Sequence, residues 1–173
     1  MKMNVFAVTV TYGNRFHLLK QVIDAALSEG VTKVIVVDNN SVIESREKLK
    51  AYEKELGSDK IKVLYLDDNY GSAGGYKRGL EEAYNDPKCD FIWLLDDDNM
   101  PLKDSLKKLL EFWFSLDIED KENKVALLSD RFVISKIFKE GIKRNIKPLR
   151  KNALAASTKF CMRPLHSSSI PSP

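Results

Sequence analysis

Four apolar runs of strand length alternate with segments of helical character, and this alternation constrains the fold more than any other feature of the chain. The runs cover residues 5–11, 33–38, 61–66 and 91–96. They are nearly continuous in β-branched and apolar side chains, as is typical of parallel strands that are buried on both faces. The pattern predicts an α/β fold in which a mostly parallel sheet has right-handed crossovers and helices on both faces.

Helices are predicted after each of these strands. Apolar residues at helical spacing follow the first strand and stop before Gly30, a typical C-terminal cap. Ser41 and Glu44 have the spacing of a capping box for the second helix. A third helix is predicted over residues 77–84, and Pro101 suits the first turn of a fourth. The inner face of that fourth helix would carry Leu102, Leu106, Leu109, Leu110 and Trp113.

The fourth strand runs directly into three consecutive carboxylates, Asp96, Asp97 and Asp98. Unpaired burial of these groups would be very costly, and crowded carboxylates repel one another unless a counter-charge is present. Alternation along an extended chain directs Asp96 and Asp98 to one side and Asp97 to the other. A solvated acidic turn is the alternative interpretation. Open α/β sheets bind ligands at the carboxyl ends of their strands, which favours a site for Mn²⁺ or Mg²⁺ that also holds phosphate oxygens.

The loops that follow strands one, two and four are expected along one edge of the sheet. The first loop supplies Thr11, Tyr12 and Arg15, and the second supplies Asp38, Asn39, Asn40 and Ser41. The carboxylate of Asp38 could accept hydrogen bonds from a base N–H or from ribose hydroxyls. The alternative role of Asp38 is that of an ordinary turn residue after a strand.

A glycine-rich loop is predicted over residues 69–79, where glycines stand at positions 71, 74, 75 and 79. Such a loop permits close approach of a ligand, and a helix that starts nearby would present N–H groups to an anion. Lys77 and Arg78 add positive charge. The segment matches neither the P-loop nor the dinucleotide-binding fingerprint. Alone it is more often a turn, but together with the aspartates it indicates a nucleotide whose phosphates share a metal ion.

Composition and charge narrow the class further. The chain has 173 residues and a formal charge of +3, which is too small to indicate a nucleic-acid partner. Its two cysteines lack metal-ligand spacing, so we expect free thiols in a reducing compartment. No signal peptide or apolar run of membrane-spanning length is found, which favours a cytoplasmic location. Residues 143–151 are basic, most simply as a solvated face, with contact to the inner surface of the membrane as the alternative.

The periodic pattern changes after Asp117. Short strands are predicted at 125–129 and 131–138, and the Ser/Pro-rich end has nothing to pack. We therefore expect a ligand-binding domain over residues 1–142 and a partly disordered tail over 143–173. The loss of pattern also suggests that the chain is the N-terminal or truncated portion of a longer protein.

Four blocks of sequence, in order, resemble the inverting family 2 glycosyltransferases of GT-A fold. The blocks cover residues 8–15, 34–41, 69–79 and 93–101, within a resemblance that spans residues 4–115. The acidic strand end and the glycine-rich segment are most similar to the rhamnosyl- and galactofuranosyl-transferase branch. The resemblance implies a GT-A-type sheet that holds a nucleotide-diphosphate sugar, linked to UDP or dTDP, with the help of a divalent cation.

The resemblance also implies roles for individual residues. Thr11 and Tyr12 would flank the base and Asp38 would hydrogen-bond it, while Asp96 and Asp98 would form the Asp-x-Asp element that holds the metal. Family members take the general base from a later acidic motif, and no acid after Asp98 stands in such a context, so no catalytic base is assigned. The residues predicted to bind the donor, from the loops and the resemblance together, are Thr11, Tyr12, Arg15, Asp38, Asn40, Asn69, Gly74, Arg78 and Asp97.

The sequence therefore predicts a metal-dependent glycosyltransferase that transfers a sugar with inversion to a glycan or lipid-linked acceptor, in the synthesis of a cell-surface polysaccharide or glycolipid. A nucleotide-sugar-binding module without catalysis is the second hypothesis. A nucleotidyltransferase is the third, disfavoured because the first strand is not followed by the glycine-rich pyrophosphate loop of that class. The oligomeric state is left open.

Overall fold

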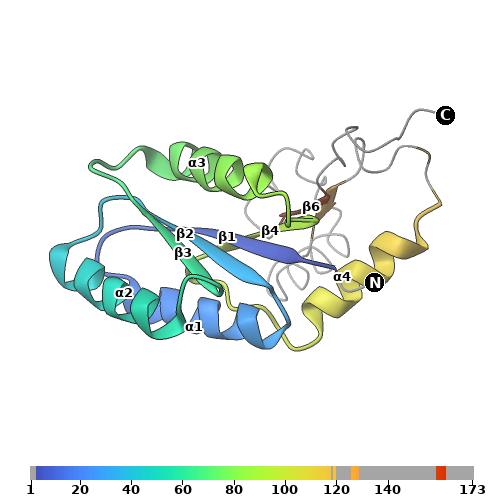
Figure 1. The fold of residues 1–173 in the computed structure, drawn as a ribbon, viewed down its shortest axis with the longest axis horizontal. Helices are drawn as coiled ribbons and strands as arrows, with labels where there is room; N and C mark the ends of the chain where they lie inside the picture. Colours follow the sequence, from blue (N-terminus) through green and yellow to red (C-terminus); the bar gives the residue numbers. More distant parts are fainter. Residues whose placement is uncertain (1–2, 118, 120–125, 129–158, 163–173) are drawn as a thin grey trace, which may run out of the picture.

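The computed structural model describes residues 3–117, 119, 126–128 and 159–162, which form a six-stranded sheet in the order β3-β2-β1-β4-β6-β5 (Figure 1). Strands β1 to β4 are mutually parallel, whereas β6 runs antiparallel to β4 and β5. The elements in chain order are β1 (Val5–Thr11), α1 (Phe16–Ser28), β2 (Lys33–Asp38), α2 (Ile43–Leu56), β3 (Ile61–Tyr65), α3 (Gly71–Asn85), β4 (Phe91–Asp96), α4 (Ser105–Ser115), β5 (Ala126–Leu128) and β6 (Lys159–Met162).

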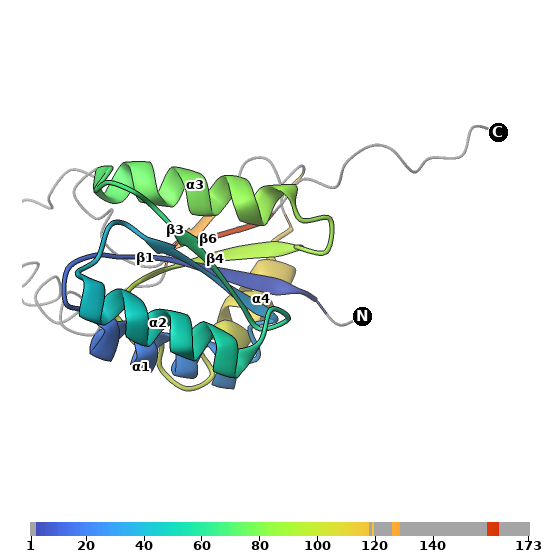
Figure 2. The same ribbon diagram turned by 60° about the vertical axis from the view of Figure 1, so that its left-hand side comes forward.

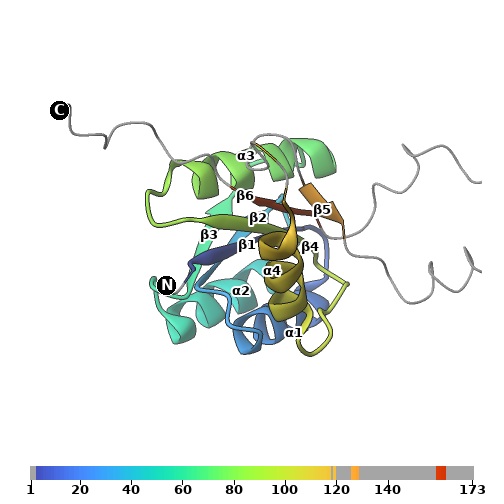
Figure 3. The same ribbon diagram turned by 90° about the vertical axis from the view of Figure 1, so that its right-hand side faces the viewer.

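The prediction of a mostly parallel α/β sheet with helices on both faces is confirmed. Helices α1, α2 and α4 lie on one face and α3 on the other (Figures 2 and 3). The side chains of β1 alternate between the two layers: Val5 and Ala7 join the core under α1, α2 and α4, while Phe6 and Val8 pack under α3. Because both faces are covered, every residue of β1 is buried, which explains its continuous apolar run.

The strand register brings the carboxyl ends of three strands to the same edge of the sheet. Thr11 at the end of β1 pairs with Asp38 at the end of β2, and Val10 pairs with Asp96 at the end of β4. Asp38 in turn lies opposite Tyr65 of β3. The loops that follow β1, β2 and β4 therefore lie along one edge of the sheet, as the sequence predicted.

The predicted glycine-rich loop is largely helical, because α3 begins at Gly71 rather than at residue 77. Gly75 and Gly79 lie on the face of α3 that contacts β1. A Cβ atom at Gly75 would lie 2.6 Å from Cγ1 of Val10, and one at Gly79 would lie 2.5 Å from Cγ1 of Val8. These two glycines allow the backbone of α3 to approach the sheet more closely than any residue with a side chain would permit.

Helix α4 begins at Ser105, so the prediction that Pro101 starts it is wrong. Leu102 is 70% exposed and does not belong to the inner face, whereas Leu106 and Trp113 are buried as predicted. The start of α4 is fixed by Glu29, whose carboxylate accepts hydrogen bonds from the backbone N–H groups of Asp104 (2.9 Å) and Leu106 (3.1 Å). An acceptor from outside the helix thus satisfies N–H groups that have no partner within it.

The predicted capping box at Ser41 and Glu44 is not formed. The N-cap of α2 is Val42, without a side-chain hydrogen bond to the helix. The backbone N–H of Ser41 instead donates to Oδ1 of Asp38 at 3.1 Å. The carboxylate at the end of β2 therefore organises this turn.

Beyond α4 the structure describes two short strands. Strand β5 falls within the strand predicted at 125–129, whereas the one predicted at 131–138 lies outside the described residues. Strand β6 was not predicted and falls in the segment assigned to the tail, most of which, including residues 143–151, is not described. Within the described part of the chain, no helix has the length and apolar character needed to cross a bilayer.

Candidate functional site

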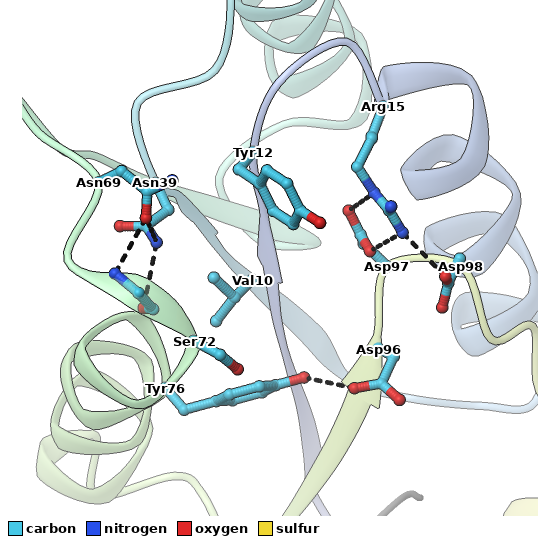
Figure 4. Close-up of a pocket in the computed structure, with 11 residues that line it drawn as sticks. Val10, Tyr12, Arg15, Asn39, Asn69, Ser72, Tyr76, Asp96, Asp97 and Asp98 are labelled. Carbon is cyan, nitrogen blue, oxygen red and sulfur yellow. Dashed lines mark hydrogen bonds and ion pairs between the residues drawn. The ribbon is translucent and has the colours of Figure 1, made fainter. Parts of the chain in front are cut away.

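A pocket of about 520 Å³ opens at the carboxyl edge of the sheet, between the ends of β1 and β4 and the start of α3 (Figure 4). It brings together six of the predicted site residues, which are Tyr12, Arg15, Asn69, Asp96, Asp97 and Asp98. Its other lining residues are Val10, Asn39, Gly71, Ser72 and Tyr76. All three aspartates line the pocket, but their hydrogen bonds differ from the predicted pairing of Asp96 with Asp98. Arg15 bonds to both Asp97 and Asp98, whereas Asp96 contacts Tyr76.

Asp97 is the most deeply anchored of the three carboxylates and is 5% exposed. Its Oδ2 atom accepts hydrogen bonds from the hydroxyl of Thr11 (2.8 Å) and from Nε of Arg15 (2.9 Å), and its Oδ1 atom accepts one from Nη2 of Arg15 (2.8 Å). A bidentate contact with a guanidinium group is stronger than a single hydrogen bond to a carboxylate. Thr11 does not line the pocket but supports it from behind through this bond.

Asp98 shares the same arginine but lies nearer to solvent. Nη2 of Arg15 donates to Oδ2 of Asp98 at 2.9 Å, and the Asp98 side chain is 45% exposed. The hydrogen bond to Asp97 raises the pKa of Arg15 above its ordinary value, opposed by partial burial and reinforced by the bond to Asp98. Arg15 is therefore a permanent cation placed between two of the three acids.

Asp96 faces a tyrosine that sequence reasoning missed. The hydroxyl of Tyr76, in α3, lies 2.9 Å from the carbonyl oxygen of Leu95 and 3.2 Å from Oδ1 of Asp96. Burial, followed by the negative charge of Asp96, raises the pKa of the Tyr76 phenol above its usual range, so the hydroxyl stays protonated. The glycines at 75 and 79 were the available signal, because they bring α3 close enough for Tyr76 to reach β4.

Asn39 joins the end of β2 to the start of α3, although the sequence analysis selected its neighbour Asn40. The amide nitrogen of Asn39 donates to Oδ1 of Asn69 (2.8 Å) and to the carbonyl of Gly71 (3.1 Å), and its Oδ1 accepts from the N–H of Tyr70 (2.9 Å). Asn40 is exposed, adopts φ +59° and does not line the pocket. Two adjacent asparagines are equivalent by pattern, and only the turn geometry distinguishes them.

Asp38 is fully buried at the end of β2 and lies outside the pocket lining. Arg46 of α2 donates to its carboxylate and also to the carbonyl of Leu66, which follows β3. Together with the bond from the Ser41 N–H, these contacts hold the turn after β2. The role of Asp38 in hydrogen-bonding a base stays a prediction.

Gly74 and Arg78 lie on α3 outside the pocket lining. Nη1 of Arg78 donates to the carbonyl of Gly74 at 2.9 Å, and its guanidinium group stacks on the ring of Tyr70 at 4.0 Å from the centroid. A Cβ atom at Gly74 would meet Cβ of Tyr70 at 2.8 Å, so this glycine permits the stack. Donor contacts by Gly74 and Arg78 likewise stay predictions.

The charges of the pocket fit a divalent cation. The lining carries three carboxylates and one guanidinium group, and Asp96 and Asp98 offer the hard oxygen ligands that Mg²⁺ and Mn²⁺ prefer. The described residues contain no group of three or more His, Cys, Asp or Glu side chains arranged around a common metal position. Magnesium sites are commonly built from one or two carboxylates, substrate phosphates and water, so two aspartates fit this chemistry.

The fold is that of the GT-A glycosyltransferases. The structure of the mannosyltransferase PcManGT from Pyrobaculum calidifontis, in complex with GDP-Man and Mn²⁺, matches with a TM-score of 0.56 and 17% identity, over 68% of this chain and 34% of that one. A 4-diphosphocytidyl-2C-methyl-D-erythritol synthase from Anaerococcus prevotii also matches, with a TM-score of 0.51 and 13% identity, over 74% of this chain and 60% of that one. Because that synthase is not named as a glycosyltransferase, the fold alone does not select an activity.

The sequence identifies the family. The model described as "Glycosyl transferase family 2" matches residues 7–155, and the chain therefore belongs to glycosyl transferase family 2. TuaG of Bacillus subtilis (strain 168), named as a putative teichuronic acid biosynthesis glycosyltransferase, is 36% identical over 80 residues, which are 46% of this chain and 29% of TuaG. The chain thus spans about a third or less of the length of TuaG and of PcManGT.

Proposed function

We propose that the protein is a metal-dependent glycosyltransferase of the rhamnosyl- and galactofuranosyl-transferase branch, which transfers a sugar with inversion from a nucleotide-diphosphate sugar to an acceptor hydroxyl. The observation that carries the proposal is the pocket, where three aspartates and one arginine converge at the carboxyl edge of the sheet in a family 2 chain. TuaG is named for teichuronic acid biosynthesis, which supports a glycan or lipid-linked acceptor in cell-surface polymer or glycolipid synthesis.

Asp96 and Asp98 would hold the divalent cation, Mn²⁺ or Mg²⁺, at the mouth of the pocket. PcManGT was solved with GDP-Man and Mn²⁺, which supports a nucleotide sugar and a metal as the occupants of a pocket on this fold. A bound cation supplies positive charge to the diphosphate that leaves as the acceptor attacks the anomeric carbon. Tyr76 would keep Asp96 in place through its hydrogen bond, and Asp97, which bonds to Arg15, would keep that arginine beside the diphosphate.

The remaining pocket residues suit the nucleoside. The ring of Tyr12 is 49% exposed and offers a face on which a base can stack. Asn39 bonds to Asn69 and to the carbonyl of Gly71 at the start of α3, so hydrogen bonds hold together the wall opposite the aspartates. We assign the base to this side of the pocket and UDP or dTDP as the carrier. The reaction would take place in the cytoplasm, at the inner face of the membrane where the acceptor is anchored in lipid.

A nucleotide-sugar-binding module without catalysis is the second candidate. It is favoured by one observation: the described residues present no carboxylate in the pocket besides Asp96, Asp97 and Asp98, which are committed to metal and arginine. Turnover separates the two candidates. An enzyme would release sugar from the donor, or transfer it to an acceptor, whereas a binding module would show affinity alone. A nucleotidyltransferase would instead join a sugar phosphate to a nucleoside triphosphate and release pyrophosphate.

The test is calorimetric titration of the full chain with UDP, dTDP and GDP, each with Mn²⁺ and with EDTA. We expect one of the nucleotides to bind with Mn²⁺, and this binding to be lost in EDTA and in Asp98→Ala. Asp59→Ala is the matched control, because Asp59 is exposed and lies far from the carboxyl edge, beside Lys33 at the opposite ends of the strands. Failure of the folded wild-type protein to bind any of the three nucleotides would overturn the proposal.

A further inference from the structure

Arg15 places a positive charge next to the aspartates that would hold the metal. Its guanidinium group bonds to Asp97 through two nitrogens and to Asp98 through one, and it lies 5.2 Å from the centroid of the Tyr12 ring (Figure 4). One side chain therefore touches an inner acid, an outer acid and the aromatic ring at the mouth of the pocket.

The two contacts of Arg15 differ in strength. Both oxygens of Asp97 are engaged, that side chain is 6% exposed, and Thr11 adds a further bond, so the Arg15–Asp97 contact is buried and two-pronged. Asp98 receives one N–H from Arg15, and its side chain is 45% exposed. A single, half-exposed ion pair contributes little free energy and is screened by solvent. The bond to Asp98 is therefore the one that a competing cation can replace.

We propose that Arg15 is an internal counter-ion that releases Asp98 when a divalent cation binds there, and that it donates the freed N–H to the donor diphosphate while it stays fixed on Asp97. This inference rests on the proposed function. Arg15 needs no change of position, because Nη2 keeps its bond to Asp97 while its second N–H exchanges partners. Nη1 has no hydrogen bond to any described residue, and one of its two N–H groups lies on the same guanidinium edge as the second N–H of Nη2.

Two consequences follow for binding. Without a nucleotide, Arg15 competes with the cation for Asp98, so Arg15 lowers the affinity of the protein for metal alone. With a nucleotide, the displaced N–H gains a phosphate acceptor, so Arg15 raises the affinity for metal and nucleotide together. A residue that only supports the fold would not act with opposite sign on these two affinities.

The experiment compares Arg15→Lys with Arg46→Lys in the full chain. The Arg15→Lys variant keeps a positive charge beside Asp97 but lacks the planar fork that reaches Asp98 as well. Arg46→Lys is the matched control, since Arg46 also pairs with a buried carboxylate, that of Asp38, and makes no contact with Asp98. Mn²⁺ affinity is measured from the electron paramagnetic resonance signal of free Mn²⁺, with and without UDP.

We expect Arg15→Lys to bind Mn²⁺ alone about threefold more tightly than wild type, the range of an exposed ion pair, and UDP to strengthen Mn²⁺ binding less than in wild type. Arg46→Lys should bind Mn²⁺ alone as wild type does. Unchanged or weaker Mn²⁺ binding by Arg15→Lys, or an equal gain in both variants, would overturn the inference and leave the proposed function standing. If the wild-type protein binds neither Mn²⁺ nor any nucleotide, the inference and the proposed function are both overturned.

A measurement on the wild-type chain covers the case in which Arg15→Lys does not fold. With ¹⁵N-labelled arginine, Asp98→Ala should shift the guanidinium signal of one arginine, which identifies Arg15. Addition of Mg²⁺ to the wild-type protein should shift the same signal. A guanidinium signal that responds to Asp98→Ala but not to saturating Mg²⁺ would show that Arg15 retains its hydrogen bond to Asp98 when metal is present. That result would overturn the inference.

Discussion

Two aspartates, Asp38 and Asp97, are both buried carboxylates at the same edge of the sheet. Asp38 ends β2 and is 0% exposed, and Asp97 directly follows β4 and is 5% exposed. Each takes an arginine as its counter-charge, Arg46 for Asp38 and Arg15 for Asp97. Burial of a charged carboxylate is tolerated only with such a partner.

The pairs differ in what else the arginine does. Arg46 extends away from the pocket to the carbonyl of Leu66 and ties β2 to the end of β3. Arg15 lines the pocket and shares its charge with the half-exposed Asp98. The position of the arginine, rather than the burial of the acid, therefore separates an architectural ion pair from one that can take part in binding.

The largest effect is expected from Asp38→Ala, which breaks the architectural pair. The variant removes the acceptor of Nε of Arg46 and of the N–H of Ser41, while the bond from Arg46 to the carbonyl of Leu66 remains. Removal of one partner from a buried pair costs about 3–5 kcal/mol, and Arg46 is 20% exposed, so we expect a loss of about 3 kcal/mol in the free energy of unfolding. Urea unfolding measures it. Asp59→Ala, at an exposed site, should change stability by less than about 0.5 kcal/mol, and a loss below about 1 kcal/mol in Asp38→Ala would contradict the comparison.

The second prediction compares Asp97→Asn with Asp38→Asn. Each substitution weakens charge-assisted hydrogen bonds at constant volume, so each should lower stability by about 2 kcal/mol. Affinity for UDP with Mn²⁺ should fall about tenfold, or about 1.4 kcal/mol, in Asp97→Asn, because Arg15 loses its fixed position. Asp38→Asn should reduce that affinity less, because Asp38 lies outside the pocket lining. A larger loss of affinity in Asp38→Asn would reverse the comparison and support the predicted contact of Asp38 with the base.

The strands and the acidic edge were predictable because one physical rule governs them. A parallel strand covered on both faces must be apolar along its length, and the runs at β1, β2 and β4 end at the residues where the sequence pattern ends. Carboxylates placed directly after such strands must then share one edge. This reasoning brought Arg15, Asp97 and Asp98 together without knowledge of their contacts.

The features that were not predicted depend on contacts between distant segments. Glycine disfavours helices, so residues 71–76 looked like a loop, but the fit of Gly75 and Gly79 against β1 outweighs that local preference. The start of α4 depends on Glu29, 75 residues away from Asp104 in the chain. The contact of Glu29 with α4 leaves no local pattern, and the spacing of Gly75 and Gly79 is a signal only once the sheet beneath α3 is known.

The smallest effect we predict concerns Thr11, which gives Asp97 a hydroxyl donor from the strand next to β4. The hydroxyl of Thr11 donates to Oδ2 of Asp97 at 2.8 Å, and Thr11 is 2% exposed. Thr11→Val keeps the shape and removes this bond, so we expect a loss of about 1 kcal/mol in the free energy of unfolding. Because the hydroxyl supports Arg15 only through Asp97, affinity for Mn²⁺ and UDP should fall by less than in Asp97→Asn.

Thr9 provides the matched control two residues earlier in β1. It is 1% exposed, and its hydroxyl has no hydrogen-bond partner among the described residues. Thr9→Val removes a buried polar group that is already unpaired, so the protein should be as stable as wild type or more stable. A double-mutant cycle of Thr11→Val with Asp97→Asn should assign most of the stability difference between Thr11→Val and Thr9→Val to coupling between Thr11 and Asp97. Equal losses in Thr9→Val and Thr11→Val would mean that strand packing, rather than the bond to Asp97, sets the cost, and would remove one of the contacts that distinguish Asp97 from Asp38.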